Sequence, residues 1–340
     1  MDMSNFIVVG ENIHCTRIVK RGGKRSATLP DGREGVLFVY NGEESILPIP
    51  ADWEKRSPAY AEGKIRHIAL AIYHAYEGAN EETRQLGENY LCWATERQIE
   101  KGATFLDVNV DEYSHDPVVT REIMTWLVTF LSDRYEIPLS IDSSNIDTIA
   151  TGLEACRQDI TPMVNSISLE REDAVEILMQ YQAHAIVSAA GKKGLPSTAD
   201  ERLANFKAII ALLDQAGMER AKMHLDSLVL PISVDSMNGK NFLESTAQAK
   251  EMFPGVNFSG GLSNISYGMP KRKLLNLVFT WLFVKAGGNG GIIDPVQMAP
   301  EEVAALDPET EAFQLAQAVL EGNDMYGMNY ISAFRAGKLG

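Results

Sequence analysis

Short apolar segments alternate with longer segments of helical periodicity along almost the whole chain of 340 residues. The apolar segments predict eight strands, at residues 6–9, 105–110, 138–142, 163–167, 185–189, 223–225, 256–262 and 291–293. The helices expected between them span residues 88–101, 120–135, 171–182, 199–216, 241–252 and 271–285. Such alternation predicts an α/β protein with a parallel sheet. Eight strands favour a single closed (β/α)8 TIM-barrel domain over residues 1–340 rather than an open Rossmann sheet.

One long segment, residues 17–58, interrupts this alternation directly after the first strand. Within it, apolar residues at 35–40 and 45–49 flank an Asn41-Gly42 pair, which predicts a β-hairpin. An insertion after a barrel strand is expected at the barrel mouth, the active-site face. It could be a lid, a docking loop for a partner, a dimer contact or a structural decoration, and the sequence leaves these open.

Charge and cysteine content exclude several classes of protein. The net charge of −15 argues against binding to nucleic acid or to an anionic membrane. Cys15, Cys92 and Cys156 form no CxxC pair, so neither a zinc cluster nor a disulfide framework is expected. The first residues do not resemble a signal peptide, and no apolar run is long enough to span a bilayer. We therefore expect a cytoplasmic protein.

Asp and Asn recur where the expected strands end, which in a TIM barrel is the active-site face. These side chains, together with one Glu and one Ser, are Glu11, Asn12, Asp107, Asn109, Asp142, Asn145, Asn165, Asp226, Ser263 and Asn264. Helix capping explains any single case, and Asp147 and Asp200 are interpreted as caps. Capping explains less well a carboxylate inside a strand, such as Asp107 or Asp142, because a partly buried acid needs a partner.

Two kinds of ligand suit a ring of carboxylates and amides. A hard cation takes several oxygen ligands, so a divalent-metal barrel enzyme is one alternative. The pyrimidine edge of a pterin is another, because its N–H donors match carboxylates and its acceptors match amide NH2 groups. The six histidines form no HxH or HExxH cluster, and His67 and His74 are interpreted as packing or surface residues. We therefore favour a pterin site and expect no bound metal.

Five segments in order make the chain resemble the pterin-binding methyltransferases. They are FLDVNVD at 105–111, SIDSSNIDTIATGLEACR at 140–157, VNSISLERE at 164–172, HLDSLVLPIS at 224–233 and FSGGLSNISYGMPKR at 258–272. The resemblance is to methyltetrahydrofolate:corrinoid methyltransferases, to the folate domain of cobalamin-dependent methionine synthase and, more distantly, to dihydropteroate synthase. Unlike dihydropteroate synthase, this chain has no lysine at the end of strand seven and no late Ser-x-Arg motif.

The resemblance implies a role for each matching position. Asp142, Asn165 and Asp226 match the residues that anchor the hydrogen-bonding edge of the pterin, and Asn264 matches the asparagine that reaches N5. The rest of the implied substrate-binding set is Asp107, Asn109, Asn145, Ser263 and Arg272. Tyr267 and Gly268 depart from the family, which often has a polar residue there.

The implied activity is transfer of a methyl group between N5 of tetrahydrofolate and the cobalt of a corrinoid, in C1 or demethylation metabolism. Because the sequence lacks a DxHxxG-type motif, the corrinoid is expected on a separate partner protein. The family also implies a homodimer. A dihydropteroate synthase-like enzyme and a non-catalytic folate-binding subunit of a methyltransferase complex remain alternatives, and the sequence does not set the direction of transfer.

Overall fold

The computed structural model describes residues 1–192 and 194–339. Eight strands form one sheet in the order β12-β11-β10-β9-β8-β7-β1-β13. Their bounds are β1 Ile7–His14, β7 Phe105–Asn109, β8 Leu139–Asp142, β9 Met163–Ile167, β10 His184–Ser188, β11 Met223–Asp226, β12 Asn257–Ser259 and β13 Gly290–Ile293. A parallel bridge between Gly261 and Ile292 joins the two ends of that order. The sheet therefore closes, and the predicted (β/α)8 TIM barrel is confirmed.

Helices alternate with the strands. They are α2 His67–Glu77, α3 Glu81–Glu100, α4 Pro117–Ser132, α5 Ile146–Ala155, α6 Ala174–Gln180, α7 Ala199–Gln215, α8 Asn238–Met252, α9 Arg272–Lys285, α10 Pro300–Ala304, α11 Glu311–Leu320 and α12 Met328–Arg335. The six predicted helices correspond to α3, α4, α6, α7, α8 and α9. Within the described residues, no helix is both long enough and apolar enough to cross a membrane.

Packing divides the chain into two compact units, which we treat separately. The N-terminal unit comprises Glu11–Glu100 and Leu106–Ile160. The C-terminal unit comprises Met1–Gly10, Lys101–Phe105 and Thr161–Gly340. Strand β1 passes from the second unit into the first, since the boundary falls between Gly10 and Glu11.

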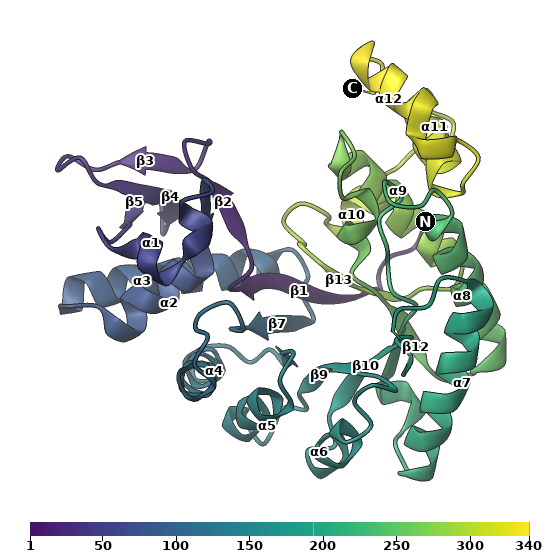
Figure 1. The fold of residues 1–340 in the computed structure, drawn as a ribbon, viewed down its shortest axis with the longest axis horizontal. Helices are drawn as coiled ribbons and strands as arrows, with labels where there is room; N and C mark the ends of the chain where they lie inside the picture. The colour runs from purple at the N-terminus through teal and green to yellow at the C-terminus, as the bar shows by residue number, and fades with distance from the viewer. Residues whose placement is uncertain (193, 340) are drawn as a thin grey trace. The chain divides into compact units, whose positions relative to one another are not determined.

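The insertion after β1 is a small antiparallel sheet within the N-terminal unit (Figure 1). The predicted hairpin is confirmed as β4 Glu34–Tyr40 and β5 Glu43–Pro48, and β3 Ser26–Thr28 adds a third strand. A separate pair, β2 Ile18–Lys20 and β6 Lys64–Arg66, and a short helix, α1 Trp53–Arg56, complete the segment.

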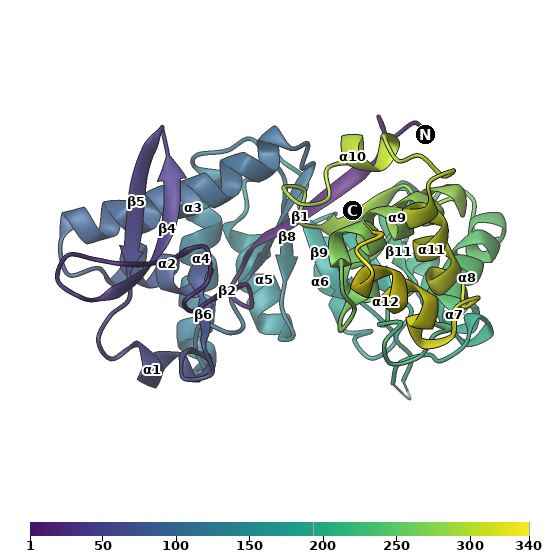
Figure 2. The same ribbon diagram turned by 90° about the horizontal axis from the view of Figure 1, so that it is seen from above.

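Aromatic side chains fix this sheet to helix α3, beside which β4 and β5 lie in both views (Figures 1 and 2). The ring of Phe38 packs edge-on against Tyr90 and Trp93, and the guanidinium of Arg25 lies over both of those rings. His74 is buried and its Nε2 lies 2.7 Å from the carbonyl oxygen of Pro48. His67 is buried too, with Nδ1 3.0 Å from the Tyr90 hydroxyl. The two histidines are therefore packing residues.

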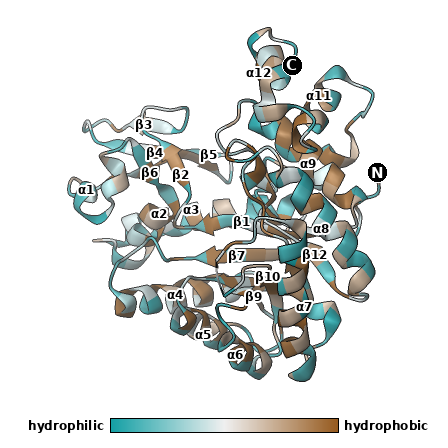
Figure 3. Ribbon diagram, turned by 45° about the vertical axis from the view of Figure 1, so that its right-hand side comes forward, coloured by the Kyte–Doolittle hydropathy of each residue, from teal (hydrophilic) through white to brown (hydrophobic). Residues whose placement is uncertain are grey.

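The C-terminal unit is built around apolar side chains that point from its strands into a common core. Its members are Val9, Phe105, Met163, Ile186 and Ile292, with Ile7 packed against them. Helix α7 buries Leu203, Phe206, Ile210 and Leu213 as its periodicity predicts, and hydrophilic and hydrophobic stretches alternate along it in Figure 3. Burial of this face stabilises a helix whose polar face remains in water.

Three of the differences from the sequence prediction bear on the fold. Strand β1 does not close at Gly10 but continues to His14, and its later part is held by the Cys15 N–H, which donates to the Asn109 carbonyl at 2.9 Å. Strand β12 ends at Ser259, because the two glycines that follow lead into a 3₁₀ helix at Leu262–Ser266. Helix α2 was missed, since residues 64–77 were left within an unassigned stretch.

Candidate functional site

The register between β7 and β8 brings four polar side chains together in the N-terminal unit. Asp107 lies opposite Ser140, and Asn109 lies opposite Asp142. Side chains directly opposite each other on one face of a sheet are close enough to interact. Accordingly, the Ser140 hydroxyl donates to Asp107 Oδ1 at 2.6 Å, and Asn109 Nδ2 donates to Asp142 Oδ2 at 3.0 Å.

His14, at the end of β1, joins this group. Its Nε2 lies 2.7 Å from Asp142 Oδ2 and 3.3 Å from Asp107 Oδ2, while its Nδ1 lies 2.9 Å from the Thr16 hydroxyl. Burial alone would lower the pKa of His14, but its hydrogen bonds to both carboxylates and their negative charges raise that pKa to about 10. His14 is thus an imidazolium at neutral pH.

Only one carboxylate of this group is accessible. The side chain of Asp107 is 1% exposed, whereas that of Asp142 is 23% exposed. Both contacts to Asp142 use Oδ2, and Oδ1 has no hydrogen-bond partner among the described residues. Asn109 is buried and engaged at both ends, since its Oδ1 also accepts from the Asp111 N–H at 3.0 Å. Asp142 is therefore the member that can accept from a ligand, and Asp107 and Asn109 support it.

Asn145, the fourth predicted residue in this unit, is a helix cap. Its side-chain oxygen accepts from the N–H groups of Asp147 and Thr148 at 2.8 and 3.2 Å, which satisfies two otherwise unpaired donors of α5. The interpretation of Asp147 and Asp200 as caps was wrong. Asp147 lies in the first turn of α5, and the cap of α7 is Thr198, which forms a capping box with Glu201.

In the C-terminal unit, Asp226 ends β11 in a different setting. The residue is 8% exposed, and its Oδ1 accepts from the Leu228 N–H at 2.7 Å. Burial raises the pKa of Asp226 to about 6, although the Leu228 hydrogen bond and the charge of Arg202 oppose the rise. Arg202 is fully buried, and its Nε and Nη1 donate to the carbonyls of Ser227 and Thr198 at 2.7 and 3.0 Å.

Ser263 and Asn264 lie in the 3₁₀ helix that follows β12, and Asn264 is exposed. Arg272 supports this loop, because its Nη2 donates to the Ser263 carbonyl at 2.9 Å and its Nε to the Ser266 hydroxyl at 3.0 Å. A Cβ added at Gly261 would come within 2.9 Å of Asn264 Nδ2, so the glycine leaves room for the amide. Arg272 therefore acts on the loop that carries Asn264.

The other polar residues of this unit divide between strand end and core. Asn165 is half-buried in β9. His224 is buried beside His184, with 3.0 Å between their ring nitrogens, and beside Phe105. Burial and the neighbouring His184 lower the pKa of His224 to about 3. His224 is thus a neutral core residue.

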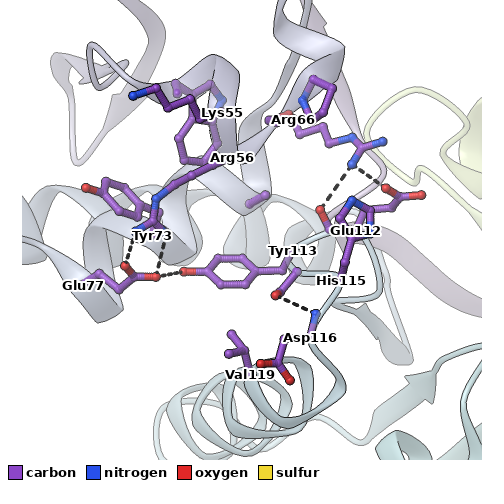
Figure 4. Close-up of a pocket in the computed structure, with 15 residues that line it drawn as sticks. Lys55, Arg56, Arg66, Tyr73, Glu77, Glu112, Tyr113, His115, Asp116 and Val119 are labelled. Carbon is purple, nitrogen blue, oxygen red and sulfur yellow. Dashed lines mark hydrogen bonds and ion pairs between the residues drawn. The ribbon is translucent and has the colours of Figure 1, made fainter.

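A cavity of about 510 Å³ lies elsewhere in the N-terminal unit, between α1, α2 and residues 112–119 (Figure 4). Four of its charged groups pair with one another. Arg56 donates to Glu77 at 2.7 and 3.0 Å, Tyr113 donates to the same carboxylate at 2.7 Å, and Arg66 pairs with Glu112. None of the residues predicted for the site lines this cavity.

Comparison with known proteins decides the family. The model of the pterin binding enzymes matches residues 89–294. The chain belongs to this family. It is 26% identical over 249 residues to a methylcorrinoid:tetrahydrofolate methyltransferase of Eubacterium limosum, with 72% of this chain and 86% of that protein covered.

Solved structures of pterin-binding enzymes share the fold. A dihydropteroate synthase from Stenotrophomonas maltophilia superposes with a TM-score of 0.52 at 15% identity, covering 66% of this chain and 86% of that one. One from Coxiella burnetii, in complex with pteroic acid, gives a TM-score of 0.51 at 14% identity over 68% and 86% of the two chains. At such identities the likeness concerns the barrel fold.

Donor atoms of His14, Asp107 and Asp142 lie within 4.8 Å of one another, a spacing at which a cation could also be held. The direct contact at 2.7 Å already gives the imidazole and the Asp142 carboxylate a hydrogen-bond partner without a cation.

Sequence reasoning missed His14 as a member of this pterin-binding enzyme's polar cluster, and missed Arg202 near Asp226. An extended first strand through residue 14 would have placed His14 beside the acids of β7 and β8. No signal in the sequence marks Arg202, which lies in an ordinary amphipathic helix.

Proposed function

We propose that this pterin-binding enzyme is a methyltransferase that moves a methyl group between N5 of tetrahydrofolate and the cobalt of a corrinoid held by a partner protein. The observation that carries the proposal is the ordered carboxylate of Asp142, which has one oxygen held by His14 and Asn109 and the other available to a ligand. The relative from Eubacterium limosum, whose name states this chemistry, supports the choice of reaction.

The pyrimidine edge of a pterin presents neighbouring N–H donors, for which ionised carboxylates are the strongest acceptors. In the N-terminal unit we assign this edge to Asp142. In the C-terminal unit, Asp226 and Asn165 offer the same kinds of group, a carboxylate and an amide that both donates and accepts. Asn109 belongs to the proposed site because it holds Oδ2 of Asp142. Asp107 belongs to it as the second carboxylate beside His14, and Asn145 as the cap of the helix that follows Asp142. Ser263 and Arg272 contribute by shaping the loop of Asn264.

N5 of the folate must gain a proton or a hydrogen bond as its bond to the methyl group breaks, because an amide anion is a poor leaving group. We assign that hydrogen bond to Asn264, whose exposed side chain extends from the loop braced by Arg272. A carboxamide cannot be the net source of a proton, so the proton comes from water. The contribution of Asn264 is electrostatic and positional.

The corrinoid would supply the cobalt centre that accepts or donates the methyl group. The chain's own part is to bind the pterin, orient N5 and stabilise the charge that develops there. Direction of transfer depends on the supply of substrates, because each of these residue roles serves the forward and the reverse reaction alike.

The test is a spectrophotometric assay with methylcob(III)alamin and tetrahydrofolate under anaerobic conditions. Appearance of cob(I)alamin that depends on tetrahydrofolate is the expected result. Asn264→Ala is expected to slow it by about 10²-fold, the usual effect of losing a hydrogen bond made to developing charge. Asn89→Ala is the matched control, because Asn89 pairs with Gln85 on the surface of α3 and should leave the rate unchanged.

Other outcomes identify the alternatives. Tetrahydrofolate binding without any change at cobalt, with free or protein-bound corrinoid, would contradict the methyl transfer and indicate a non-catalytic folate-binding subunit. Turnover of p-aminobenzoate with a dihydropterin diphosphate would indicate a dihydropteroate synthase.

A further inference from the structure

His14 occupies a position that no role in the proposed reaction yet accounts for. Its ring is fixed from both sides, since Nδ1 lies 2.9 Å from the Thr16 hydroxyl and Nε2 lies 2.7 Å from Asp142 Oδ2. The backbone beside it is held as well, because the Cys15 N–H donates to the Asn109 carbonyl. The side chain of His14 is 17% exposed, so it lies at the solvent edge of the group that it forms with Asp107 and Asp142.

We propose that His14 is a positioning residue for the pterin substrate, which keeps the Asp142 carboxylate ionised and turned so that its Oδ1 accepts from the N–H groups of the pyrimidine edge. This inference rests on the proposed function, because it assumes that the ligand is a reduced pterin. It deepens that function by naming which contact makes Asp142 competent to bind.

The electrostatic problem at this site is the proximity of two carboxylates. Burial and the negative charge of Asp107 raise the pKa of Asp142 above its usual value, and the contacts with His14 and Asn109 lower it but offset that rise only in part. The imidazole of His14 has two negatively charged neighbours, which favour its protonated form. Asp142 has one negatively charged neighbour and the imidazole, so the proton resides on His14. The three groups then carry a net charge of about −1, and without the imidazolium two neighbouring carboxylates would favour protonation of Asp142.

The other ionisable groups around His14 do not supply this charge. Asp107 comes from β7 and Asp142 from β8. On the strand of His14 itself, Glu11 is paired with Arg17 at 3.2 Å. Burial raises the pKa of the adjacent Cys15 above its usual range, so that thiol is neutral. Asp111, after β7, accepts hydrogen bonds from Ser143 and the Ser144 N–H.

The experiment compares tetrahydrofolate binding by the wild-type protein and by His14→Gln between pH 6 and pH 9. Glutamine keeps a donor of similar reach but cannot carry a positive charge. We expect His14→Gln to bind about tenfold more weakly at pH 6.5, because loss of the positive charge raises the pKa of Asp142 and each unit by which that pKa exceeds the pH reduces the ionised fraction tenfold. The two proteins should converge towards pH 9, where Asp142 ionises unaided. His115→Gln, which changes an exposed histidine outside the group, is the control and should match the wild type.

A ligand-free measurement separates failure of this inference from failure of the proposed function. The ¹⁵N chemical shifts of the His14 ring should report an imidazolium up to about pH 9 in the wild type, and a lower pKa in Asp142→Asn. An equal loss of affinity at every pH, or no loss, would overturn the role of His14 in ionising Asp142. Wild-type protein that retains the imidazolium yet binds no tetrahydrofolate would overturn the substrate and leave the charged pair standing.

Discussion

The two acids proposed to bind the pterin edge are stabilised in opposite ways. Asp142, in the N-terminal unit, contacts the imidazolium of His14 directly at 2.7 Å and remains partly exposed. Asp226, in the C-terminal unit, is buried and accepts a backbone hydrogen bond from Leu228. Arg202 influences Asp226 through its charge, while its guanidinium donates to the carbonyls of Ser227 and Thr198.

This difference matters because burying an ionised carboxylate without an ion pair lowers the stability of the folded protein, whereas an ion pair in direct contact offsets that cost. One acid is therefore expected to contribute to folding and the other to oppose it. Substitutions at each acid and beside it distinguish the two modes of stabilisation.

The largest effect is expected on stability at pH 8, with opposite signs for the two acids. The pKa of Asp226 is raised from 3.8 to about 6, so its ionised form destabilises the folded protein above pH 6 by about 3 kcal/mol, and the cost disappears below about pH 4. Asp226→Asn should therefore raise the free energy of unfolding at pH 8. Asp142→Asn should lower it by about 1–3 kcal/mol, because His14 loses its closest partner.

Urea denaturation of both variants and of the wild type at pH 8 measures this contrast. Destabilisation of equal size in the two variants would contradict it. Both variants should bind tetrahydrofolate more weakly whatever their stability, since each loses an acceptor.

The second effect is on the pH dependence of ligand binding. Asp226 accepts hydrogen bonds best as a carboxylate, which is present above its pKa of about 6 and is lost as the pH falls through that value. Tetrahydrofolate affinity should therefore fall up to tenfold for each pH unit below 6. Asp226→Asn should lose this dependence, and calorimetric titration between pH 5 and pH 8 distinguishes the two proteins. A wild-type affinity that stays constant down to pH 5 would show that Asp226 does not titrate in this range.

A smaller effect is expected from filling the space beside each acid. A Cβ at Gly260 would lie 3.1 Å from Asp226 Oδ1 and 3.2 Å from the Phe242 ring, so Gly260→Ala should shift the carboxylate. A Cβ at Gly152 would instead meet Ile141 at 2.6 Å, on the strand of Asp142 but not on its carboxylate.

We expect Gly260→Ala to weaken tetrahydrofolate binding several-fold and Gly152→Ala to act mainly on stability, by about 1–3 kcal/mol of overpacking. Binding constants and melting temperatures of the two variants provide the measurement. The reverse assignment would contradict the placement of Asp226 beside the ligand.

The smallest effect is expected from removing metal. Since His14 already satisfies Asp107 and Asp142, methyl transfer should be unchanged after dialysis against EDTA and on addition of Mg²⁺ or Zn²⁺. Loss of activity on chelation, restored by one cation, would instead assign these three residues to a metal.

The sequence predicted much of the fold, because buried parallel strands and amphipathic helices leave strong periodic patterns. Strand β9 matches its predicted bounds, and β7, β8 and α7 differ from theirs by one or a few residues at their ends. The prediction of an element's end failed where no periodic pattern marked that end. Glycine at position 10 suggested the end of a strand that in fact continues to His14.

The sequence predicted which residues belong to the candidate site, but not how their side chains contact one another. Asp107, Asn109 and Asp142 could be singled out because acids and amides are unusual within strands. Their different roles could not be predicted, since each role depends on which side-chain atom contacts which neighbour. Asn145 shows the same limit, because an asparagine before a helix is equally suited to a ligand and to the cap it forms.

What the sequence by itself determined is the order of strands and helices, the predicted hairpin and the family to which the chain belongs, since periodicity and motif order are local properties. Only the tertiary structure decided that β1 brings His14 to the acids of β7 and β8, and that Asp226 lies buried under the influence of Arg202. The charge of a carboxylate depends on burial and on neighbours distant in sequence, and these are established only when the strands pair.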